Sequence, residues 1–253
     1  MAPVVGGSIL GYFTLSSSFS YQMVYGVCGG AGLITFILAL MLPVPEETVY
    51  LGQSWSETFR VFKSVALNRK ILITCFVEAS ILFAYGTFET FLPLYAVKNG
   101  LTAAHVGIFL SGQIIVLALT KPIMGRFSDT HGRKPQIVAG GILGTVCIGG
   151  FYCVISFFPM LLLSIAFGLC LSVVTSATSA YIADLSSQQA RGSAMGILGS
   201  IMDIGHTSGP LLSGIVAANF GYAHSFLGAS LVLLSVTLLF FFTIGSPNGG
   251  YTA

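Results

Sequence analysis

The chain has 253 residues, of which 55% are hydrophobic and only 7% are charged. About a quarter of the residues of an ordinary soluble domain are charged, so this composition excludes a soluble fold and indicates helices that face lipid. The net charge of +2 includes no basic block, which argues against a nucleic-acid partner, and the scattered cysteines form no CxxC pair, which argues against a disulfide framework or a metal site.

Long apolar segments recur along the chain and predict an all-α integral membrane protein of about eight transmembrane helices. The predicted spans are residues 1–13, 21–42, 71–97, 105–124, 135–155, 159–183, 194–218 and 224–242. All but the first are of spanning length. No cleavable signal peptide is visible, because no basic residue precedes the first apolar run. This opening is typical of the middle of a membrane segment and predicts a chain truncated at its N-terminus.

The basic residues predict the orientation of the chain in the membrane. All of those in the inter-helix segments, except Lys98, fall in segments that the alternation of spans assigns to one side. Basic residues concentrate on the cytoplasmic side of membrane proteins. The sequence therefore predicts that both termini are cytoplasmic.

The longest connection, residues 43–70, is predicted to be a cytoplasmic linker. Residues 54–57 form a capping box that would begin a helix. Trp55, Phe59 and Phe62 then share one face, which favours an amphipathic helix along the inner membrane surface. A solvated linker is the alternative interpretation.

The connection between the fourth and fifth predicted spans carries the most specific motif. It reads Gly125-Arg-Phe-Ser-Asp129-Thr-His-Gly132-Arg133-Lys134-Pro135. The glycines permit a sharp turn, and the basic pair can anchor the turn against lipid head groups. The segment resembles the signature loop G-x-x-x-D-R-x-G-R-K of the major facilitator superfamily, although Thr130 replaces the usual basic residue. An ordinary positively charged loop is the alternative.

The resemblance implies a bundle of the facilitator type, in which such loops close one face of a transporter by ion pairing and release it during alternating access. Asp129 and Arg133 would have this role here. Asp184 and Arg191 bracket the next cytoplasmic connection, and we expect them to be the partners of the loop because they should lie on the same membrane face.

A weak internal repeat links the two ends of the chain. Pro3 and Gly7 recur as Pro210 and Gly214 at the same offset, and matching helix pairs are typical of duplicated transporter folds. With the family resemblance, the repeat predicts that residues 1–42 are the last two helices of a truncated N-terminal bundle. Residues 43–70 are then the linker, residues 71–243 a complete six-helix C-terminal bundle and residues 244–253 a cytoplasmic tail.

Small residues and a proline follow one another along the seventh predicted span. They are Gly196, Gly205, Gly209, Pro210 and Gly214. Small residues allow helices to approach closely and proline bends a helix, so the span is predicted to be a hinge or packing surface. The spacing resembles a motif that proton-coupled exporters of the family have in their fifth helix. Simple helix packing explains the glycines nearly as well.

Ionisable residues inside the predicted spans are candidate proton or substrate sites, because charges in lipid are costly. Glu78 and Glu89 lie about three turns apart on one face of the third span. Asp203 is followed one turn later by His206 in the seventh span, and Gln113 adds an amide to the fourth. Each has a structural alternative: a carboxyl capped by a neighbouring hydroxyl, an Asp–His hydrogen bond that braces the hinge, or a polar group bonded to its own helix.

The favoured function is secondary active transport of a small solute by alternating access, with proton-coupled export of a lipophilic or drug-like compound preferred over nutrient or metabolite uptake. No Walker-type GxxxxGK[ST] segment or nucleophile motif occurs in the sequence, so we expect neither an enzyme nor a cofactor. The expected partners are the solute, protons and the lipid of the inner or plasma membrane. Since four family helices would be missing, a non-transporting fragment or assembly subunit is the alternative, as is a second chain that supplies them.

Overall fold

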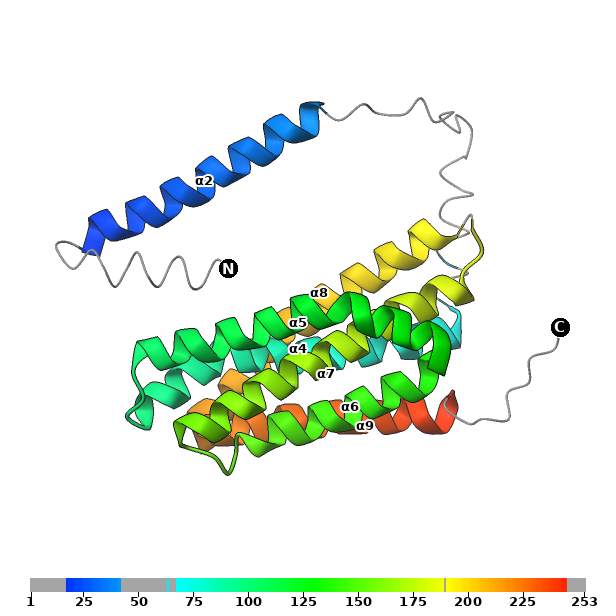
Figure 1. The fold of residues 1–253 in the computed structure, drawn as a ribbon. Helices are drawn as coiled ribbons and strands as arrows, with labels where there is room; N and C mark the ends of the chain where they lie inside the picture. The colour runs from blue at the N-terminus through cyan, green and yellow to red at the C-terminus, as the bar shows by residue number, and fades with distance from the viewer. Residues whose placement is uncertain (1–16, 42–62, 64–66, 189, 245–253) are drawn as a thin grey trace. The chain divides into compact units, whose positions relative to one another are not determined.

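The structure is a computed structural model that describes residues 17–41, 63, 67–188 and 190–244. Within these ranges the chain forms seven α helices and no strand (Figure 1). They are α2 (Ser17–Met41), α4 (Arg69–Lys98), α5 (Ala103–His131), α6 (Arg133–Gly150), α7 (Phe157–Leu185), α8 (Arg191–Phe220) and α9 (Tyr222–Thr243). Each coincides with one predicted span, which confirms the all-α class. The predicted span at 1–13, with Pro3 and Gly7, and the capping box of the linker lie outside the described residues.

Four of the described helices, α4, α5, α7 and α9, are long and apolar enough to cross a membrane. The apolar part of α2, Tyr25–Met41, is shorter. Helix α8 is long enough but falls outside this group of apolar helices, and Asp203, His206 and several glycines and serines lie along it. Gly205, Gly209 and Ser213 of α8 face α4, whereas Asp203 is exposed.

Helices α4 to α9 belong to one compact unit, residues 59–253, and α2 belongs to the other. Helix α4 contacts every other helix of its unit, most extensively α8, while α5 and α6 pack mainly against α7. The interior of this bundle is rich in phenylalanine. Phe88 of α4 lies 5.6 Å from Phe151 and 5.5 Å from Phe167, measured between ring centroids. The buried face of α4 thus holds the bundle together.

Glycines bring α4 and α8 into close contact. A Cβ atom on Gly205 would overlap the Ala79 backbone, one on Gly209 would overlap the Phe83 carbonyl, and one on Gly86 would overlap the His206 carbonyl. A hydrogen bond of 2.8 Å between the Thr87 and Ser213 hydroxyls fixes the same crossing. By contrast, a Cβ on Gly196 would meet nothing within 4 Å. Only the part of the glycine motif around Gly205 and Gly209 therefore forms a packing surface. Pro210 lies within the same helix.

Candidate functional site

Arg133 links the ends of three helices. Its Nε donates a hydrogen bond of 2.6 Å to Asp184 Oδ2, and its Nη1 lies 2.7 Å from Asp129 Oδ1. Nη1 also donates to Ser128 Oγ at 2.7 Å. Partial burial lowers the pKa of Arg133, but the hydrogen bonds and charges of Asp184 and Asp129 outweigh this effect and raise the pKa overall. The arginine therefore stays charged and connects α5, α6 and α7 at one end of the bundle.

The segment expected to be a loop is largely helical. Helix α5 continues through Gly125 to His131, and Gly132 alone forms the turn into α6 with φ 90°. Few residues other than glycine tolerate this backbone conformation. One turn into α6, Gln136 Nε2 donates to the Met124 carbonyl at 3.0 Å. The tight turn positions Arg133 within reach of both acids.

Two further basic residues expected at this end lie outside the cluster. Lys134 and Arg191 form no ion pair with any acid in the part of the chain that the structure describes. Ser128, which sequence reasoning did not single out, takes a place beside Arg133. The sequence feature that could have identified Ser128 is its position in the motif, one residue before Asp129.

Glu78 is enclosed between α4 and α7, with none of its surface exposed. Thr178 donates a hydrogen bond to its Oε2, whereas its Oε1 has no partner among the described residues. The Thr178 hydroxyl also lies 2.8 Å from the Val174 carbonyl, so its one hydrogen serves competing acceptors. No other charged side chain in the described ranges is buried. Glu78 is thus a buried carboxyl whose hydrogen-bonding capacity is incompletely used.

Glu89 and His206 meet at the accessible surface of α4 and α8. His206 Nε2 lies 3.4 Å from Glu89 Oε2, and both side chains are about half exposed, 44% and 48% respectively. The His206 ring also stacks on Tyr85 with ring centroids 5.4 Å apart. The expected partner of His206 was Asp203, but in the structure His206 contacts Glu89 and Tyr85 instead. His206 leans toward α4 at the close crossing, whereas Asp203 is exposed on α8.

The remaining candidates do not join these groups in one site. Asp203 lines a shallow hollow of about 410 Å³ whose other lining residues all come from α8. Gln113 is fully buried on α5, and neither polar atom of its amide has a partner among the described residues. Gly168 of α7 packs against the Gln113 backbone. The structure therefore shows three separate polar features: the Arg133 cluster, the buried carboxyl of Glu78 and the exposed Glu89–His206 pair.

Comparison with known proteins finds one matching family model and several similar proteins. The family model described as Major Facilitator Superfamily matches residues 75–252. The chain is 32% identical to the "Multi-drug resistance efflux pump PmrA homolog" of Lactococcus lactis subsp. lactis over 188 residues, which cover 71% of this chain and 45% of the relative. It is 31% identical to the "Multi-drug resistance efflux pump PmrA" of Streptococcus pneumoniae, over 60% of this chain and 39% of the relative.

A further relative is the "Tetracycline resistance protein, class H" of Pasteurella multocida, which is 27% identical over 69% of this chain and 45% of the relative. The chain spans less than half the length of each of these three relatives. The match covers the part of the chain that contains α5 to α9 and most of α4, and with it the Arg133 cluster and Glu78.

Proposed function

The chain belongs to the major facilitator superfamily, and from this premise we propose that it works in proton-coupled export of a lipophilic or drug-like compound by alternating access. Support comes from relatives whose names describe multidrug efflux pumps and a tetracycline resistance protein. The chain is a multi-pass membrane protein, and we place both termini in the cytoplasm because of the distribution of its basic residues. Helices α4 to α9 would then form one six-helix half of the transporter.

The buried carboxyl of Glu78 carries the proposal of proton coupling. A charged carboxylate enclosed in a helix bundle is costly, while the uncharged acid is much less so. Glu78 has no ion pair with any described residue and leaves one oxygen without a hydrogen bond. A conformational change that opens the α4–α7 contact to water would allow the carboxyl to exchange a proton. Proton binding and the conformational cycle are thereby coupled.

The Arg133 cluster suits a gate at the cytoplasmic end. Exposed ion pairs each contribute only about 0.2–1 kcal/mol, and both acids of the cluster have more than half of their side-chain surface exposed, 59% and 55%. Such contacts can break and re-form during a transport cycle. Because these contacts join the ends of α5, α6 and α7, they require one particular arrangement of the three helices.

Glu78→Gln tests the coupling. The amide keeps the shape of the side chain but cannot bind and release a proton, so we expect proton-driven solute flux to fall to the level of vesicles without the protein. Exchange of labelled for unlabelled solute without a proton gradient should continue. Both fluxes are measured in inverted membrane vesicles.

Glu89→Gln is the matched control for this experiment, because Glu89 lies on the same helix but is half exposed and faces His206. It should retain proton-driven flux. If Glu78→Gln kept proton-driven flux equal to that of the parent protein, the assignment of the proton site to Glu78 would be wrong.

A further inference from the structure

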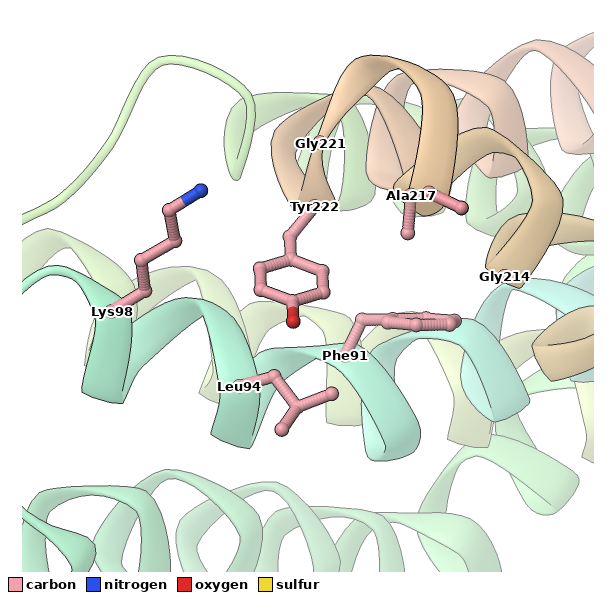
Figure 2. Close-up of a pocket in the computed structure, with 8 residues that line it drawn as sticks. Phe91, Leu94, Lys98, Gly214, Ala217, Gly221 and Tyr222 are labelled. Carbon is pink, nitrogen blue, oxygen red and sulfur yellow. The ribbon is translucent and has the colours of Figure 1, made fainter.

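A cavity of about 490 Å³ lies between α4, α8 and the start of α9, at the end of the bundle opposite the Arg133 cluster. Figure 2 shows the side chains that line it. It runs between the last two turns of α4 and of α8, and the first residue of α9 closes one side. Its lining residues are Phe91, Leu94, Lys98, Gly214, Ala217, Ala218, Gly221 and Tyr222. From Lys98 to Phe91 the α4 wall is two turns long, or about 10 Å. The cavity is therefore a slot that extends from the helix ends toward the middle of the membrane.

The slot has one charged group, at its mouth. The Lys98 ammonium lies 5.6 Å from the centroid of the Tyr222 ring, a cation–π contact. Lys98 forms no ion pair with any acid of the described ranges. Below this cation the side chains of the lining are mainly aromatic and aliphatic, with the Phe91 and Tyr222 ring centroids 6.0 Å apart. The Tyr222 hydroxyl points toward α4, between Leu94 and Phe91 (Figure 2). The slot thus has a cation at its mouth and mainly apolar side chains below it, together with one phenol hydroxyl.

The slot stays open because the facing α8 wall bears only small residues. Gly214, Ala217 and Ala218 lie at helical spacing along that wall, and Gly221 forms the turn from α8 to α9. A Cβ atom on Gly214 would make only ordinary contact with Phe91, at 3.7 Å. Unlike the glycines at the α4–α8 crossing, Gly214 is therefore not required for close backbone packing. Its small size instead leaves space beside Phe91.

We propose that this slot binds one acidic phospholipid from the leaflet at its end of the bundle. The lipid phosphate lies at Lys98, and the first part of an acyl chain lies along Leu94 and Phe91. Lys98 is the last residue of a spanning helix, which places its ammonium at the depth of lipid head groups, and aromatic residues such as Tyr222 favour the same depth. A small free anion would leave the apolar wall uncovered, and a lipid of zero net charge would compensate the Lys98 cation less fully than an acidic lipid.

The inference concerns lipid recognition and does not depend on the transport activity. It requires that the bundle spans a bilayer and that the slot between α4 and α8 opens to the lipid.

Tryptophan quenching tests it in the full chain. The single tryptophan of the chain is Trp55, so Trp55→Phe removes the background signal and Tyr222→Trp places an indole at the slot. The protein is reconstituted in phosphatidylcholine bilayers that contain an equal mole fraction of either brominated phosphatidylglycerol or brominated phosphatidylcholine. Brominated phosphatidylglycerol should quench the indole more strongly. Lys98→Gln should reduce this preference about fivefold, the expected contribution of one lysine near an acidic lipid surface.

Matched variants make the result specific. Lys98→Arg should retain the preference, and Lys134→Gln, which changes a lysine at the other end of the bundle, should leave it unaltered. Ala217→Leu fills the slot and should reduce quenching by both brominated lipids. Leu94→Trp provides a second reporter on the opposite wall, so that the test does not depend on the folding of Tyr222→Trp.

Equal quenching by the two lipids with both reporters would overturn the proposal, as would a preference for phosphatidylglycerol that survives Lys98→Gln. Millimolar inorganic phosphate should not reverse quenching by brominated phosphatidylglycerol. Reversal would show a site for the anion alone and would contradict the lipid assignment.

Discussion

Gly209→Val is expected to disrupt the α4–α8 crossing and lower the free energy of unfolding by about 3 kcal/mol. The new Cβ would overlap the carbonyl of Phe83, which belongs to the backbone of α4 and cannot rotate away. The helices would have to separate, and the Thr87–Ser213 hydrogen bond at the same crossing would be lost with their contact. Close packing of small residues is a main source of stability between membrane helices. Thermal unfolding of the purified protein in detergent measures the loss.

Gly196→Val is the matched control, because it places the same side chain on the same helix where a Cβ would meet nothing within 4 Å. The only expected effect is the difference in helix propensity, which is below about 1 kcal/mol and favours valine, so the free energy of unfolding should not fall. Equal destabilisation by the two substitutions would contradict the packing role of Gly209.

Arg133→Gln should slow transport about tenfold, because it removes both charge-assisted hydrogen bonds of the cluster, and a loss of about 1.4 kcal/mol is a tenfold change. Asp184→Asn should have a smaller effect, since Asp129 still pairs with Arg133. The double substitution should be no worse than Arg133→Gln alone, because the two residues act through one contact. Initial rates of solute flux in vesicles give all three values.

Lys134→Gln controls for the loss of positive charge at this end of the bundle. Additive effects of Arg133→Gln and Asp184→Asn would show that the contact has no part in transport. A simple exchange of charges between positions 133 and 184 is a poorer test, because an acid at position 133 would face Asp129.

The helices of the bundle could be predicted from the sequence because each spanning segment is a long apolar run. The ends of the helices were predicted less well. The predicted fourth span ends at residue 124, but α5 continues to His131, because no residue in the motif before Gly132 requires a backbone conformation foreign to a helix. The contact between Asp129 and Arg133 joins two residues that are close in sequence on either side of the Gly132 turn, and the resemblance to the signature loop gave both of them an ion-pairing role.

Most contacts between helices distant in sequence were not foreseeable, although Asp184 was expected near the motif because both should lie on the same membrane face. Thr178 meets Glu78 across a separation of 100 residues, and nothing in either segment alone identifies its partner. The expectation for His206 considered only neighbours on α8, whereas the close approach permitted by Gly205 and Gly209 brings it to Glu89 and Tyr85 of α4. Side-chain partners in a bundle follow from which helices pack, and a single sequence does not specify that pairing.

Tetracycline accumulation in inverted membrane vesicles tests the proposed export function most directly. With a proton gradient, acidic inside, vesicles that contain the protein should accumulate tetracycline above its external concentration, and a protonophore should abolish the accumulation. The choice of solute follows the name of one relative, and a lipophilic dye provides a second solute. Accumulation of both solutes equal to that in vesicles without the protein, and unaffected by the protonophore, would contradict proton-coupled export.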